Sequence, residues 1–222
     1  MPRRSAIRSG ALTGLAQVVV ALAAAGAGAL LAHKFGRNAE TDGFLSAYAV
    51  YLVFVLAAQA FRMVVVPDLT RAAAEGRLGG ESRNYALAYL CLAVPVCLLV
   101  AVFRSQLGDL LTGSLPPQSA HVASRALVVL VPAAFVQLLA ALAASGLAAL
   151  DSYGTAAAGF ALGGLAGLVV FAALADRHGI VSLAWGLGAN AVVAVAVPTV
   201  ALWRRHALGG PRPPRLEIGA RL

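Results

Sequence analysis

Five polar side chains interrupt the long apolar runs of this sequence, and these residues are the ones placed to do chemistry inside them. They are Gln17, Gln59, Arg62, Gln137 and Asn190. Amides within apolar helices bond to a neighbouring helix more often than to a ligand. The guanidinium of the arginine is a permanent cation whose N–H groups suit an anionic partner such as a phosphate.

Arg62 has two interpretations. It lies four residues from the end of an apolar run, so its long side chain can extend to the membrane surface while its stem stays in the apolar region. An ionisable group at membrane depth is costly, however, and such groups mark substrate pathways. Arg62, Gln59 and Asp42 are therefore the candidate substrate-binding or coupling residues.

Other reactive constellations are missing from the sequence. There is no Gly-rich phosphate loop, no G-x-S-x-G or H-E-x-x-H motif, and no Cys/His ligand set. The two cysteines, Cys91 and Cys97, lie six residues apart in one apolar run and are expected to pack. We therefore expect no enzyme activity, no metal and no nucleotide cofactor. A transport activity would be driven by the membrane potential or an ion gradient.

Composition places the chain among membrane proteins. Of its 222 residues, 60% are hydrophobic and 12% are charged, against about 25% charged in a soluble domain. A membrane-spanning helix needs about 20 mostly apolar residues, and six stretches qualify. These are about 11–33, 44–66, 85–103, 126–150, 154–175 and 180–203. The predicted fold is an all-α bundle of six transmembrane helices.

The arginines and lysines predict orientation. With the N-terminus in the cytoplasm, the inside segments hold eleven Lys and Arg residues and the outside segments five. Both termini are therefore expected in the cytoplasm. Residues 1–10 form a basic N-terminal segment, and 204–222 form a basic, Pro/Gly-rich tail that can touch anionic lipid. Because the basic residues lie in loops and tails, we expect membrane lipid and no nucleic acid as a partner.

Two external connections carry local signals. Residues 34–43 read as a tight hairpin, in which Thr41 or Asp42 would cap the next helix and the aspartate would complement its dipole. Segment 104–125 predicts a short interfacial helix bearing Leu107, Leu110 and Leu111, followed by a Pro-Pro turn.

Packing signals are clear. Gly159, Gly163 and Gly167 recur every four residues, which lets two helix backbones approach closely. This glycine seam either packs inside its own bundle or contacts another lobe or subunit. Prolines fall inside three predicted spans, where they are expected to kink the helices: Pro95, Pro132 and Pro198.

Two segments carry a family resemblance. AHKFGRNAETDGFLSAY at 32–48, followed by VVVPDLTRAAAEGR at 64–77, resembles the first helical hairpin of the MviN/MurJ lipid flippases. These flippases belong to the multidrug/oligosaccharidyl-lipid/polysaccharide exporter superfamily. Residues 131–160 and 179–190 resemble spans four to six of the same fold. The resemblance covers most of residues 11–203.

The resemblance implies a bacterial cytoplasmic-membrane protein that moves a polyprenyl-pyrophosphate-linked cell-wall or polysaccharide precursor by alternating access between two six-helix lobes. This chain corresponds to the N-terminal lobe, so a second lobe is expected from a copy of itself or another chain. The family's cavity arginines fall here on other residues, namely Ala21, Ala27, Val55 and Leu56. A non-transporting scaffold or degenerate member in envelope synthesis is therefore the alternative. A small-solute exporter ranks last, because aromatic residues make up only 7% of the chain.

Overall fold

The part of the chain that the structure describes folds into six long helices and one short one. The computed structural model describes residues 2–208, with side chains from residue 10 onward. The helices are α1 (Pro2–Lys34), α2 (Ala39–Ala74), α3 (Leu78–Val102), α4 (Arg104–Thr112), α5 (Pro117–Ala148), α6 (Tyr153–His178) and α7 (Ser182–Arg204), with a 3-10 turn, η1 (Gly179–Val181), before α7. No strand occurs between residues 2 and 208, which confirms the all-α prediction.

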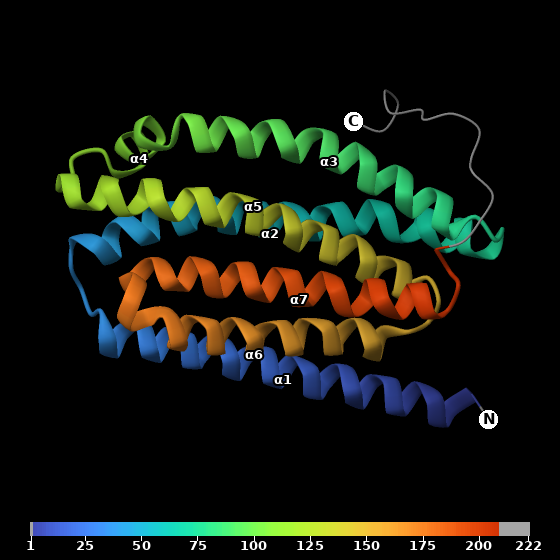
Figure 1. The fold of residues 1–222 in the computed structure, drawn as a ribbon. Coiled ribbons are helices and arrows are strands. Elements are labelled where there is room, and N and C mark those ends of the chain that lie inside the picture. The colour runs from blue at the N-terminus through green and yellow to red at the C-terminus, as the bar shows by residue number, and fades with distance from the viewer. Residues whose placement is uncertain (1, 209–222) are drawn as a thin grey trace.

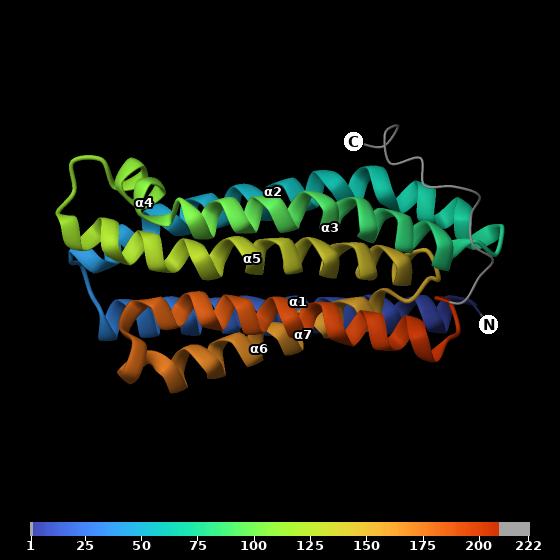
Figure 2. The same ribbon diagram turned by 45° about the horizontal axis from the view of Figure 1, so that its top comes forward.

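The long helices form two layers (Figures 1 and 2). One layer holds α2, α3 and α5, with α4 at its end, and the other holds α1, α6 and α7. Helix α5 joins the layers, because it packs on α2 and α3 on one side and on α7 on the other. Helix α1 lies at the edge of the bundle and packs on α6. The start of α1 and the end of α7 lie at the same end of the bundle.

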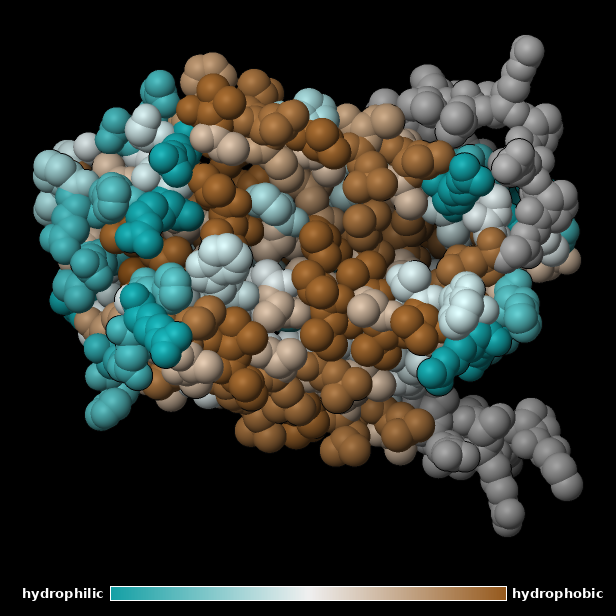
Figure 3. Space-filling view, viewed as in Figure 1, coloured by the Kyte–Doolittle hydropathy of each residue, from teal (hydrophilic) through white to brown (hydrophobic). Residues whose placement is uncertain are grey.

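The helices are long and apolar enough to cross a membrane. Five stretches meet this criterion, the last of which, Tyr153–Arg204, covers both α6 and α7. Figure 3 shows a broad hydrophobic band across the middle of the face in view and hydrophilic residues at both ends of it. Of the most apolar part of α5, 67% is buried, against 6% of α3. Helix α5 is therefore the core of a multi-pass membrane protein, and the outer helices present leucine and valine to lipid.

The helices extend beyond the predicted spans. Helix α1 begins at Pro2, so most of the expected basic N-terminal segment is helical, while 209–222 of the expected tail lie outside the described residues. Helix α2 continues through Pro67 to Ala74. Helix α3 begins at Leu78 and α5 at Pro117. Hydropathy detects only the part of a helix inside hydrocarbon, whereas α2, with 36 residues, is about 54 Å long.

The corner between α1 and α2 is built differently from the prediction. The N-cap of α2 is Asn38, whose Oδ1 accepts from the backbone N–H of Thr41 at 2.9 Å. The expectation that Thr41 or Asp42 caps the helix is wrong, because α2 begins earlier, at Ala39. The hydroxyl of Thr41 donates to the carbonyl of Gly36, whose φ of +62° ends the turn after α1. The chain reverses here, but α1 and α2 then pack on different helices.

Replacing Asn38 with alanine is expected to destabilise the protein by about 1 kcal/mol, because an N-cap side chain satisfies a backbone donor that has no partner within the helix. Chemical denaturation in detergent would measure this loss. Alanine at Asn84, which lies in α3 away from a helix start, is the control. An unchanged midpoint for the Asn38 variant would show that the corner holds without its cap.

The glycine seam of α6 faces α7. A Cβ added to Gly163 would lie 2.7 Å from the backbone oxygen of Asn190, and one added to Gly167 would lie 2.7 Å from that of Gly186. Gly159 packs on the ring of Pro198, which is fully buried. The glycine seam therefore packs against α7 of the same chain, the first of its two predicted partners. Opposite it, α1 covers a second face of α6 through contacts such as Val20 and Ala23 on Gly164.

The three predicted kink prolines lie inside continuous helices. Pro95 is in α3, Pro132 in α5 and Pro198 in α7. None of them ends its helix, as expected where neighbouring helices in a membrane bundle support the backbone. A role in bending remains a prediction.

The short helix predicted within residues 104–125 is confirmed, and its external, interfacial position remains a prediction. Helix α4 occupies the segment predicted as interfacial, and its Gly108 packs against the backbone of Ala120 in α5. Leu107 and Leu111 face the core, whereas Leu110 is 77% exposed. Helix α5 then starts at the predicted Pro-Pro turn, with Pro117 in its first turn, where the missing N–H costs nothing.

Candidate functional site

Helix α2 carries its side chains in stripes with a seven-residue repeat. The buried stripe faces α5 and contains Phe44, Tyr51, Ala58, Val65 and Ala72. This spacing is typical of two helices that wrap around each other. The residues on either side of this buried stripe form the two flanks of the α2–α5 contact.

One flank of α2 is closed by α3. The ring of Phe61 contacts those of Tyr85 and Tyr89 of α3, with centroids 6.1 and 6.0 Å apart. Two turns further along α2 from Phe61, the carboxylate of Asp68 accepts a hydrogen bond from the hydroxyl of Tyr85 at 2.7 Å. All the partners on this flank are therefore within the chain.

The opposite flank of α2 is incompletely covered. Tyr48, Val55 and Arg62 follow one another at seven-residue intervals, and each is half-buried. Gln59 lies beside them and is exposed. Helices α2 and α7 both pack on α5, yet they barely contact each other. We call these four residues the open flank of α2.

Arg62 is the only charged residue of the open flank. Among the described residues it has neither a hydrogen bond nor an ion pair. Asp68, the nearest acid along α2, is held by Tyr85 on the other flank. Arg62 lies about 18 Å from the C-terminal end of α2. A half-buried cation without a counter-ion can extend to the lipid–water boundary or bind an anion from outside the chain.

Gln137 of α5 lies level with residues 56 and 57 of α2, about 8 Å before Arg62 along the helix axis. The rings of Phe54 of α2 and Phe135 of α5 contact each other in a tilted arrangement with centroids 5.2 Å apart, which sets the register of these parallel helices. Gln137 is five turns from Ser119, which contacts α2 by donating to the carbonyl of Ala39 at 2.7 Å. Gln137 therefore lies on the α2 side of α5. Its Oε1 is buried and has no hydrogen-bond partner.

The other two intramembrane amides lie elsewhere. Asn190 packs against Gly163 between α6 and α7, and its Oδ1 also has no partner among the described residues. Gln17 is exposed on α1. The prediction that such amides bond between helices is therefore wrong for Gln137 and Asn190, whose amide oxygens accept nothing from a neighbouring helix.

Asp42 is separate from the open flank. It is exposed in the first turn of α2, and it lies about 30 Å along the helix from Arg62. The residues that follow it, Gly43 and Phe44, are buried against α5 and have a packing role. The structure therefore brings Arg62 and Gln59 together but not Asp42. As predicted, Asp42 lies where a negative charge complements the helix dipole.

Sequence reasoning missed the aromatic member of the site. Tyr48 shares its flank with Arg62, and its ring stacks on those of Phe44 and Tyr51. The signal was present in the sequence as the spacing 48, 55, 62 beside the apolar spacing 44, 51, 58, 65. Gln137 was noticed as an intramembrane amide, but only the register of α2 on α5 associates it with Arg62.

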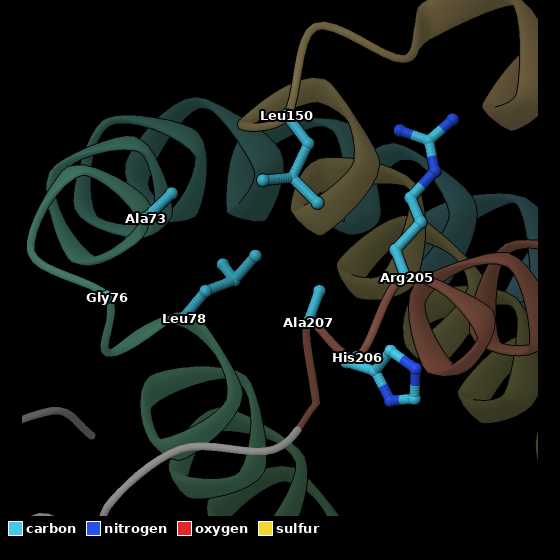
Figure 4. A pocket seen from close by; sticks show the side chains of 7 residues that line it. All are labelled: Ala73, Gly76, Leu78, Leu150, Arg205, His206 and Ala207. Atoms are coloured by element: carbon cyan, nitrogen blue, oxygen red, sulfur yellow. The ribbon is translucent and has the colours of Figure 1, made fainter.

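A separate pocket lies at the end of the bundle where α7 ends (Figure 4). Its volume is about 450 Å³, and it is lined by Ala73, Gly76, Leu78, Leu150, Arg205, His206 and Ala207. Arg205 donates to the hydroxyl of Ser152 at 2.9 Å, which ties the segment after α7 to the α5–α6 turn. None of the predicted site residues lines this pocket.

The search for metal ligands and relatives gives little further guidance. Residues 2–208 contain no group of three or more His, Cys, Asp or Glu side chains placed to hold a metal ion. Comparison of the chain with protein-family models, with curated proteins and with solved structures finds no match. The open flank and the resemblance described above are therefore the features that point to a function.

Proposed function

We propose that this chain is one lobe of a flippase-like transporter that moves a lipid-linked cell-wall or polysaccharide precursor across the bacterial cytoplasmic membrane. The lobe would rock against a second one, so that the open flank of α2 faces each side of the membrane in turn. The MviN/MurJ-like segments support the fold assignment. The observation that carries the proposal is Arg62, a half-buried cation with no partner among the described residues.

A lipid-linked anion is the natural partner for such a residue. A flippase must take a charged head group through the bilayer, and a cation on an incompletely covered flank lowers the cost of that passage. Gln59 adds an amide one turn before Arg62 on the same flank. The expected driving force is the membrane potential or an ion gradient.

The alternative is a scaffold in envelope synthesis with the same fold. It is favoured by the residues at the family's cavity-arginine positions, since Ala21, Ala27, Val55 and Leu56 carry no charge. A scaffold needs no cation on the open flank, and it would tolerate a neutral residue at position 62.

Depletion of the protein from its native cells separates the two functions. A flippase lobe is expected to cause build-up of the lipid-linked precursor at the inner leaflet, measured by extraction and mass spectrometry. Complementation with the intact chain should reverse the build-up. Normal precursor levels after depletion would contradict transport and support the scaffold.

Cross-linking in the native membrane tests the second lobe. We expect a species near twice the monomer mass, or a defined complex with another six-helix chain, because the open flank alone has no opposite wall. A cysteine introduced at exposed Gln59 should capture this partner, whereas one at Leu98, on the lipid-facing side of α3, should not. A monomer under all conditions would argue against alternating access.

A further inference from the structure

We propose that the open flank selects a lipid that carries a single phosphate and a hydroxyl-bearing head group, in preference to a pyrophosphate. This inference rests on the proposed function, and it names the substrate class of the same site. It follows from the number of cations at the site and from the unpaired buried atom of Gln137.

The flank supplies one positive charge. Arg62 is the only Lys or Arg of the open flank, since the other members are Tyr48, Val55 and Gln59. The next basic residue along the helix, Arg71, is exposed about 14 Å further on. A phosphodiester carries one negative charge, which one guanidinium neutralises with two parallel hydrogen bonds. A pyrophosphate would leave at least one further charge unpaired in a medium of low dielectric, which is costly.

The second requirement comes from α5. The buried Oε1 of Gln137 accepts no hydrogen bond, and in hydrocarbon such an oxygen has no water to satisfy it. A hydroxyl group can donate a hydrogen bond to this oxygen. A polyol or sugar head group therefore suits this position.

Two contacts between α2 and α5 set the levels of the two groups along the helices. The Phe54–Phe135 contact sets Gln137 level with residue 56 of α2. The Ser119–Ala39 bond sets it level with residue 57. Arg62 is thus five or six residues further along, or about 8 Å. A phosphate bound at Arg62 would therefore place its adjoining head group near the level of Gln137.

The test is lipid binding by the full chain in detergent, measured by native mass spectrometry. The probes are phosphatidylglycerol (one phosphate, two head-group hydroxyls), phosphatidic acid (one phosphate, no head-group hydroxyl) and a polyprenyl pyrophosphate. We expect phosphatidylglycerol to bind most tightly. Arg62→Gln should weaken both phospholipids about tenfold, and Gln137→Leu should remove the advantage of phosphatidylglycerol over phosphatidic acid. Arg71→Gln is the matched control and should change neither.

Three outcomes would overturn the inference. The first is tighter binding of the pyrophosphate through Arg62, and the second is equal binding of all three lipids. The third is unchanged phospholipid binding by Arg62→Gln, with Arg62→Lys as the folded, binding-competent control. None of these measures transport, so the proposed function stands or falls separately on precursor build-up after depletion. Build-up together with preferred pyrophosphate binding would refute the substrate class alone.

Discussion

Precursor export is expected to fall at least about tenfold when Arg62 is replaced by alanine. The guanidinium is half-buried on the open flank of α2 and has no partner among the described residues. Its removal should therefore leave the fold intact while the transported anion loses its counter-charge. Export would be measured as rescue of precursor build-up in depleted cells, at matched amounts of protein in the membrane.

Arg71→Ala is the control for this variant. Arg71 lies on the same helix but is exposed beyond Pro67, so its loss should leave export unchanged. Arg62→Lys should retain part of the activity, because an ammonium keeps the charge but not the planar pair of donors. Full export by the alanine variant would remove Arg62 from the mechanism. It would leave the interpretation in which the Arg62 side chain extends to the membrane surface.

Gly43→Ala is expected to have the largest effect on stability, about 3 kcal/mol or more. A Cβ at this position would overlap the backbone of Ser119, where α2 and α5 meet most closely. The overlap involves main-chain atoms, so no side chain can move aside to relieve it. Separating the helices would also break the bond from the Ser119 hydroxyl to the Ala39 carbonyl. Thermal unfolding and the yield of monodisperse protein in detergent would measure the loss.

Gly28→Ala provides the matched comparison. Gly28 is also inside a long helix, but nothing lies within 4 Å of a Cβ added there. Alanine should be neutral or stabilise α1 slightly, because glycine is the poorer helix former by about 1 kcal/mol. Equal behaviour of the two variants would mean that α2 and α5 can separate at their tight end without cost.

The sequence was sufficient for the architecture because its signals there are compositional. Six apolar runs, turns between them and the amphipathic stretch at 104–112 do not depend on which helix lies beside which. The glycine spacing 159, 163, 167 likewise predicted a close helix contact, and α7 provides it. These features depend only on residues that are near each other in the chain.

The partners of the helices could not be predicted in the same way. Lipid and helix interiors are equally apolar, so hydropathy does not reveal that α5 is buried while α3 is not. The open flank is recognisable only from the structure, in which Phe61 and Asp68 on the other flank contact Tyr85 of α3. The cap at Asn38 was missed because the helix start was placed at the hydrocarbon edge. That Gln137 lies level with residues 56 and 57 of α2 depends on a helix register that no local pattern contains.

The position of α1 has a consequence for biogenesis. Helix α1 packs on α6, which begins at Tyr153. More than a hundred residues must therefore leave the ribosome after α1 before α6 is available to pack against it. At about 5–20 residues per second, this takes on the order of ten seconds. During that time the first helix waits in the bilayer while α2, α3 and α5 assemble, and an insertase or chaperone has its longest opportunity to hold the chain.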